Sequence, residues 1–159
     1  MSQMSEVVVS RHAAQEIMHC ALTAAPQPCA GLLAGHGRSV GAAMALVPHP
    51  EDGPGRPHAG DFRDAADTAR QHGLGIIGWF HSRIDSHEPD DAAMRRLEQL
   101  SGSIRELAPQ ASPIHLLVAL DTKGRLDLHA YVRNHADRLL PVPLRLFDDT
   151  PLYLRSAKR

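Results

Sequence analysis

The apolar positions of this chain alternate along its length between the spacing of strands and that of helices. Short apolar runs bounded by Gly, Pro or charged residues are typical of strands. Such runs occur at Val7–Val9, through Ala30, Leu32 and Leu33, at Ser39–Val47, Leu74–Phe80, Ile114–Leu120 and Leu126–Val132, with a last edge strand expected within Leu144–Leu154. Turns at Gly35–Gly37 and Asp121–Gly124 predict that the second run pairs with the third, and the fifth with the sixth, as hairpins.

Three other segments repeat apolar residues every three or four positions, which is the period of an amphipathic helix. The first follows Ser10, a residue suited to cap a helix N-terminus. The second is expected to begin at Asp61 and to be closed by Gly73, and the third to span Asp90–Ala108. Their apolar faces hold Ala14, Ile17, Met18, Ala21 and Leu22; Phe62, Ala65, Ala66 and Ala69; and Ala93, Leu97, Leu100, Ile104 and Leu107.

The predicted order is strand, helix, hairpin, helix, strand, helix, hairpin, with Pro48–Gly60 as an exposed loop. This mixture predicts an α/β (α+β) fold in which helices pack on a mixed, mainly antiparallel sheet. At 159 residues and 43% hydrophobic content, the chain suits a single domain over residues 1–159. Such a domain buries enough surface to fold without disulfides or a structural metal.

The charge of the chain excludes several kinds of partner. Its formal net charge is -1, with no basic stripe for nucleic acid and no acidic block. Met1–Ser5 lacks the basic start of a signal peptide, and no apolar stretch is long enough to span a membrane. We therefore expect a cytoplasmic protein that binds neither nucleic acid nor membrane.

The chain has two cysteines, Cys20 and Cys29. Their spacing matches neither a zinc pair nor a disulfide framework. Two free, buried thiols are therefore favoured over a redox pair.

One of the eleven histidines, His81, has a context that suggests chemistry. It ends the run Gly75-Ile-Ile-Gly-Trp-Phe-His81-Ser82-Arg83, in which residues 81 and 83 point the same way if the strand continues. Two histidines so placed, with a carboxylate from the next helix and a water, would form a catalytic zinc site. The metal would activate the water and a nearby Glu would take its proton.

This segment resembles the signature of the JAMM (MPN or JAB domain) zinc metallopeptidases in their compact prokaryotic form. That signature reads Gly-(Trp/Tyr/Ile)-(Tyr/Phe)-His-Ser-His-Pro, followed by Ser-x-x-Asp, and an upstream Glu precedes a Cys-Gly-Leu-Leu-x-Gly strand. The matching residues here are Gly78-Trp-Phe-His81-Ser82, Pro26-Gln-Pro-Cys-Ala-Gly31-Leu-Leu-Ala-Gly35, Leu46-Val-Pro-His49 and Asp61-Phe62. The resemblance covers most of the chain and implies a cytidine-deaminase-like sandwich.

The working groups of that family are mostly replaced. The position of the catalytic Glu falls on Pro28, beside Gln27, and neither residue can act as a base. The second histidine is Arg83, which has no lone pair for a metal. Counting onward, the following proline falls on Ile84, the aspartate ligand on Met94 or Ala93, and the assisting serine on Asp91 or Asp90.

The former pocket, Pro28, His81, Ser82 and Arg83, therefore retains one ligand, His81, with Ser82 as motif context. This predicts a non-catalytic binding or scaffold module without a cofactor. The resemblance implies a protein or peptide partner, such as the extended tail of a ubiquitin-like or sulfur-carrier protein, and pairing into a homo- or heterodimer. A purely structural subunit is a further reading.

The alternative function is a zinc-dependent metallopeptidase or isopeptidase whose ligands have moved to His81, His87 and Asp91. Against it, Asp90 and Asp91 suit the N-terminus of the following helix, and His87 suits a solvated loop.

The roles of two pocket residues stay open at this stage. Arg83 is either a surface cation or an ion-pair partner of Asp85, Asp90 or Asp91 across the old metal position. His81 is either a buried, hydrogen-bonded core residue, the reading favoured here, or a remnant of the pocket.

Overall fold

The computed structural model describes residues 6–46, 59–100, 113–134, 136 and 138–148, which form eight strands and three helices. In chain order the elements are β1 (Val7–Ser10), α1 (Arg11–Ala24), β2 (Ala30–His36), β3 (Ser39–Leu46), α2 (Ala59–Gln71), β4 (Gly75–Ile84), α3 (Asp91–Leu100), β5 (Ile114–Leu120), β6 (Leu126–Arg133), β7 (Leu139–Val142) and β8 (Leu144–Phe147).

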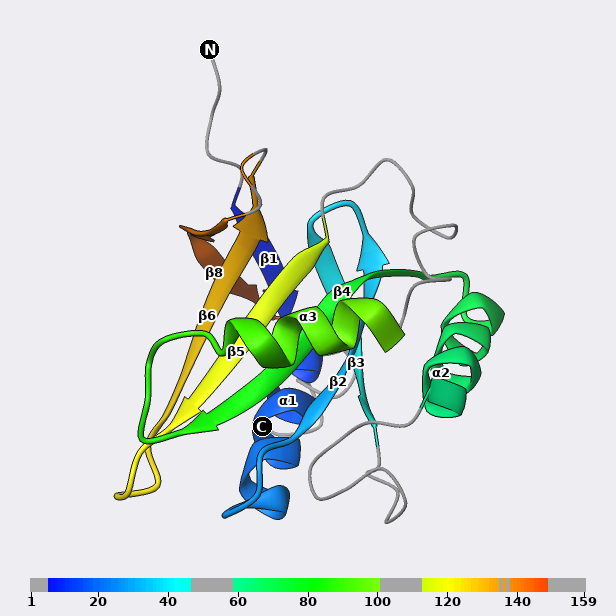
Figure 1. Cartoon of the computed structure of the whole chain (residues 1–159). Helices are drawn as coiled ribbons and strands as arrows, with labels where there is room; N and C mark the ends of the chain where they lie inside the picture. The colour runs from blue at the N-terminus through cyan, green and yellow to red at the C-terminus, as the bar shows by residue number, and fades with distance from the viewer. Residues whose placement is uncertain (1–5, 47–58, 101–112, 135, 137, 149–159) are drawn as a thin grey trace, which may run out of the picture.

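All eight strands form one sheet, in the order β7-β6-β5-β4-β2-β3-β1-β8 (Figure 1). Strand β2 is antiparallel to β3 and β4, and β6 is antiparallel to β5 and β7. The pairs β4–β5, β1–β3 and β1–β8 are parallel. The sheet is thus mixed and mainly antiparallel, which confirms the expected α+β class.

Helices cover both faces of the sheet. On one face α1 packs through Ala13, Ile17 and Ala21 into a core that includes Val7 and Phe80. On the other face the apolar sides of α2 and α3 pack into a second core with Trp79 and Leu32. Figure 1 shows α3 lying across the strands on this second face. Residues 85–90 connect the end of β4 to the start of α3.

Local sequence signals account for several of the observed ends of helices and strands. Ser10 caps α1 by accepting a hydrogen bond from the backbone N–H of Ala13 at 3.0 Å. Gly73 follows α2 with φ +74°, a conformation that favours glycine. In the hairpin between β5 and β6, the carboxylate of Asp121 accepts the N–H groups of Lys123 and Arg125.

Other ends differ from the expectation. Helix α2 begins at Ala59, so Asp61 lies within the helix and not at its N-cap. The last two residues of the loop expected over 48–60 therefore belong to the helix. The rest of that loop, Val47, the helix continuation over 101–108 and the tail beyond Asp148 lie outside the described residues.

Strand β7 is absent from the sequence prediction because Pro141 interrupts its short apolar run. A proline has no backbone N–H to donate. An inner strand needs donors toward both of its neighbours, whereas an edge strand has a neighbour on one side only and tolerates a proline. β7 lies at one end of the strand order, where that condition is met.

Candidate functional site

His81 lies inside the sheet near the C-terminal end of β4. Its backbone is flanked by Ala30 of β2 and Leu117 of β5, and the residue is only 3% exposed. Strand β4 continues through Arg83 to Ile84. Because side chains two positions apart on a strand point to the same face, His81 and Arg83 share one face of the sheet.

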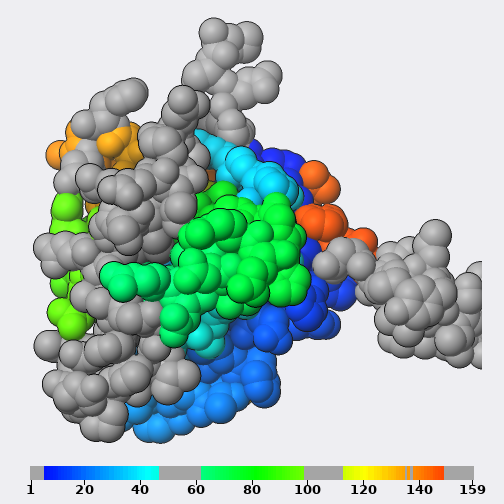
Figure 2. Space-filling model, turned by 90° about the vertical axis from the view of Figure 1, so that its right-hand side faces the viewer, coloured from blue at the N-terminus to red at the C-terminus, as the bar shows by residue number. Residues whose placement is uncertain are grey.

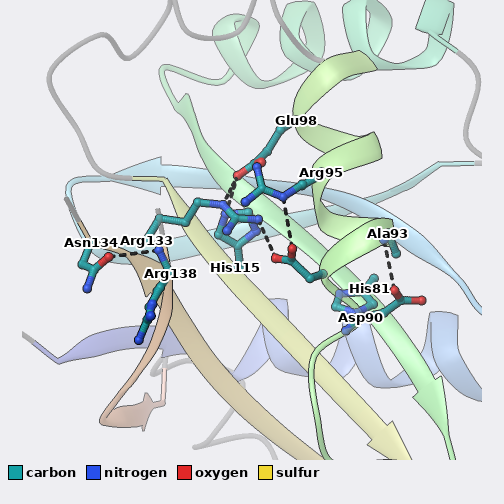
Figure 3. Close-up of polar contacts among 10 residues, drawn as sticks. His81, Asp90, Ala93, Arg95, Glu98, His115, Arg133, Asn134 and Arg138 are labelled. Atoms are coloured by element: carbon teal, nitrogen blue, oxygen red, sulfur yellow. Dashed lines mark hydrogen bonds and ion pairs between the residues drawn. The ribbon is translucent and has the colours of Figure 1, made fainter. Parts of the chain in front are cut away.

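The two ring nitrogens of His81 differ in their surroundings. Nε2 accepts a hydrogen bond from the backbone N–H of Asp90 at 3.3 Å, as Figure 3 illustrates, and Nδ1 is buried without a hydrogen-bond partner among the described residues. Burial lowers the pKa of His81 to about 4; the carboxylate of Asp90 opposes this shift, while His115 and Arg83 add to it. The ring is therefore neutral near pH 7, and because Nε2 accepts, we assign its proton to Nδ1.

The segment Asp85–Asp90, which we call the cover segment, is held by contacts from both β4 and β6. Arg83 donates from its guanidinium to the backbone carbonyl oxygen of Glu88 at 3.1 Å. His87 Nε2 lies 3.1 Å from Asp127 Oδ2. With the Asp90–His81 bond, these contacts hold the cover segment close to the candidate metal position.

The ion pair that was one of the two interpretations of Arg83 is not observed among the described residues. Among the described residues, Arg83 contacts a backbone carbonyl and forms no ion pair with Asp85, Asp90 or Asp91. Asp90 instead caps α3, accepting the N–H of Ala93 at 3.2 Å. The contact is exposed, and an ion pair at such a position would contribute little to stability.

Asp91 pairs with two other arginines, Arg95 on its own helix and Arg133 at the end of β6. Arg133 also pairs with a second carboxylate. It reaches Asp91 Oδ1 at 3.0 Å and Glu98 Oε2 at 2.9 Å, with 12% of its own side chain exposed (Figure 3). The same Glu98 oxygen lies 3.1 Å from Nε2 of the buried His115, although the ring N–H is not aligned for a hydrogen bond. The His115 ring stacks at a tilt on Trp79, with centroids 4.9 Å apart.

These contacts fix the charges of the cluster. Burial raises the pKa of Glu98, but the contacts from His115 and Arg133 outweigh it and hold that pKa below its usual value. Hydrogen bonding from Arg133 first, and from Arg95 next, lowers the pKa of Asp91. Both carboxylates are therefore ionised at neutral pH and tie α3 to the sheet.

The three ligands of the alternative zinc site do not converge. The acceptor nitrogen of His81 is used by Asp90, His87 lies beside Asp127, and Asp91 is bound by Arg133 and Arg95. Within the described part of the chain, no group of three or more His, Cys, Asp or Glu side chains could hold a metal ion. These residues do not fit a zinc ion in the arrangement observed.

The remaining positions of the resembled motif also carry no hydrolytic chemistry. Pro28 and Gln27 are exposed and precede Cys29, whose backbone carbonyl accepts the N–H of Ser82. Pro28 therefore lies close to the end of β4, but it has no ionisable group. Met94, at the aspartate position, is 1% exposed and belongs to the core.

The cluster of Arg133, Glu98 and His115 is absent from the sequence prediction. Part of its signal is readable, because Asp91, Arg95 and Glu98 recur at steps of four and three along α3 and so share one face. Nothing in the sequence indicates that Arg133, 35 residues after Glu98, would reach this face.

Comparisons with known proteins support the fold alone. No family model matches the chain, and no curated protein does. The solution structure of protein DSY2949 from Desulfitobacterium hafniense is similar, with a TM-score of 0.63 and 18% identity over 90% of this chain and 94% of that one.

In the part of the chain that the structure describes, no helix is long and apolar enough to cross a membrane.

The low pKa of His81 predicts that stability depends on pH through this residue. Its pKa is about 4 in the folded protein and about 6.5 in the unfolded chain, so the unfolded chain takes up the proton first. The contribution of His81 to the free energy of unfolding is therefore unchanged above about pH 6.5. As the pH falls toward 4, the free energy of unfolding decreases by up to ~3 kcal/mol. Urea unfolding at a series of pH values measures this loss.

The matched variants are His81→Gln, whose amide oxygen can replace Nε2 as acceptor without titrating, and His36→Gln at an exposed position. The first should flatten the profile between pH 6.5 and 4, and the second should leave it unchanged. An unflattened profile in His81→Gln would show that another group carries the dependence.

Proposed function

We propose that this protein is a non-catalytic binding module with a JAMM-type fold. Its ligand is an extended peptide segment, such as the C-terminal tail of a ubiquitin-like or sulfur-carrier protein. The observation that carries the proposal is the hydrogen bond from the Asp90 N–H to Nε2 of His81. It occupies the acceptor nitrogen of His81, the one histidine of the resembled metal site that this chain retains.

The surrounding residues support a loss of hydrolysis. A hydrolase of this kind needs a general base near its activated water, and Pro28 stands at that position. Arg83 adds a permanent positive charge two residues from His81, which opposes a divalent cation. His81 and Ser82 are 3% and 1% exposed, so they offer a ligand no surface in this arrangement.

The edge of the sheet is a better place for an extended ligand. β8 is the last strand at one end of the strand order, and an outer strand can accept a further strand through its backbone. β8 contains no proline, whereas β7 at the opposite edge contains Pro141. Figure 2 shows the orange-red C-terminal segment at the molecular surface beside the dark blue of the N-terminal segment, and β8 also presents Leu146, which is 49% exposed. We therefore place the ligand along β8.

The expected result is binding without cleavage. Isothermal titration of the full chain with a ubiquitin-like or sulfur-carrier protein that has a free tail should give saturable binding, equal in zinc chloride and in EDTA. Fusions through that tail, and isopeptide-linked substrates, should stay intact, since loss of a general base alone commonly costs a factor of ~10²–10⁴. Leu146→Asp should weaken binding about tenfold or more, because charge on an edge strand opposes strand addition.

Leu22→Asp is the matched control, since Leu22 is 51% exposed but lies on α1. It should bind as the natural chain does. Equal weakening in both variants, or no binding of any tail, would contradict the proposal. Cleavage that requires zinc and is lost in both His81→Ala and His87→Ala would replace it with the zinc metallopeptidase.

A further inference from the structure

The cover segment is anchored at its two ends. The backbone N–H of Asp85 donates to the carbonyl oxygen of Leu120 at 2.8 Å, which continues the pairing of β4 with β5. At the other end, the carbonyl oxygen of Asp90 accepts the N–H of Met94 at 3.0 Å in the first turn of α3. The residues between these anchors, Ser86–Pro89, therefore bridge the end of a strand and the start of a helix.

Two exposed contacts hold these bridging residues against the sheet. The guanidinium of Arg83 donates to the carbonyl oxygen of Glu88, and this bond is exposed. His87 pairs with Asp127 through side chains that are 61% and 60% exposed. Exposed polar contacts of this kind each contribute little to stability, because water competes for the same groups. The closed position of the cover segment therefore depends on weak contacts acting together.

A third contact closes the segment over His81. The N–H of Asp90 donates to Nε2 of this histidine at 3.3 Å, which is longer than the usual ~2.9–3.0 Å of such a bond. The ring is 3% exposed, and its Nδ1 is buried without a hydrogen-bond partner among the described residues. A buried polar atom without a partner carries a desolvation cost. Movement of the cover segment would relieve that cost by admitting water to the ring.

The backbone is strained at one of the two anchors. Asp85 has a φ of +59°, and among the described residues no other residue except glycine has a positive φ. This left-handed conformation is unfavourable for residues with a Cβ, and aspartate and asparagine tolerate it better than most. The strain is released when the backbone turns to a negative φ, so Asp85 stands where a hinge is favoured.

We propose that the cover segment is a hinged lid, which opens as a unit about Asp85 and Asp90 while the strands and α3 stay folded. The closed lid occupies Nε2 of His81, and the open lid presents that nitrogen to a ligand as a hydrogen-bond acceptor. The proposal is independent of the binding placed at β8, because β2, β3 and β1 separate β4 from that strand in the sheet.

The test is hydrogen exchange of single amides in the full-length protein, followed by NMR in urea below the unfolding transition. The reference is the N–H of Ser82, which donates to the carbonyl oxygen of Cys29 at 2.9 Å. After correction for intrinsic rates, the Asp90 N–H should exchange at least about 100-fold faster than this reference, at a rate that low urea does not change. Equal protection of the two amides with the same urea dependence would overturn the proposal, because the segment would then open only when the domain unfolds.

Opening as a unit is tested by removing contacts at other points of the lid. Asp127→Ala and Arg83→Met should each raise the exchange rate of the Asp90 N–H about two- to fivefold, the range set by exposed contacts, and leave that of Ser82 unchanged. The matched control is Arg70→Met, which removes an arginine from an exposed ion pair on α2 and should change neither amide. An Asp90 rate that stays constant in both lid variants would contradict a lid that opens as a unit.

The hinge is tested at Asp85, whose side chain is exposed. Asp85→Val should raise the exchange rate of the Asp90 N–H about tenfold, because a β-branched residue strongly disfavours the left-handed conformation of the closed lid. Asp85→Asn, which tolerates that conformation, should stay within about twofold of the natural chain. Equal rates in the two variants would contradict the hinge, and the urea series on the natural chain decides the matter if Asp85→Val fails to fold.

Discussion

Gly78→Ala should lower the free energy of unfolding by about 3 kcal/mol or more, the upper end of the cost of overpacking a core. A Cβ at this position would overlap the backbone of Ile114, with which Gly78 pairs between β4 and β5. Backbone cannot rotate away as the end of a side chain can, so the two parallel strands would have to separate. Urea unfolding followed by circular dichroism measures the loss.

Gly41→Ala is the matched control, because Gly41 also lies in the sheet but a Cβ there would come no nearer than 4.0 Å to the oxygen of Ala34. Its stability should change by no more than about 0.5 kcal/mol. Comparable losses in the two variants would show that the close approach of β4 to β5 does not set the cost. The pairing of Gly78 with Ile114 belongs to the same register of β4 and β5 that places Trp79 opposite His115.

Arg133→Met should cost about 2–3 kcal/mol, measured in the same way. Removing one partner of a buried ion pair commonly costs ~3–5 kcal/mol, and the 12% and 17% exposure of Arg133 and Glu98 reduces that figure. The substitution keeps most of the side-chain volume, so the loss reports on charge. Glu98 would then be left partly buried without its guanidinium partner, and Asp91 would lose its bond to the sheet.

The control for this charge effect is Arg70→Met, which removes an arginine from an ion pair with Asp67 that is 63% and 51% exposed. That pair should contribute ~0–0.5 kcal/mol, since exposed pairs are screened by water. If Arg133→Met were as mild, the cluster would not anchor α3. A double variant of Arg133→Met with Glu98→Leu should regain part of the stability, because no partly buried charge is left alone.

The candidate site was predictable only where local spacing governs it. The strand period indicated that the side chains of residues 81 and 83 lie on the same face of a strand, and β4 does continue through both. Asp90 stands where a helix N-cap is favoured, and it caps α3 in the structure. The partner of Arg83 could not be read from local spacing, because the choice between a carboxylate and the carbonyl of Glu88 depends on the path of the cover segment. The hydrogen bond to His81 depends on the same path.

The sequence by itself determined the kinds of element, most of their order and several of their ends. Apolar periodicity, the Ser10 cap, Gly73 and the Asp121 turn act within a few residues, so their physics is readable along the chain. It also determined that Pro28 has no group that can act as a base and that Arg83 has no lone pair for a metal, in any fold.

Only the tertiary structure decided which distant residues meet. The parallel pairing of β4 with β5 places His115 beside Trp79, and the antiparallel pairing of β5 with β6 places Arg133 where α3 presents Glu98. The packing around α1 likewise decides that Cys29 is buried and Cys20 half-buried, both as free thiols. Local turn signals indicated the two hairpins, β2 with β3 and β5 with β6. The other contacts arise from the packing of whole elements, and local spacing does not specify which elements will be neighbours beyond a hairpin.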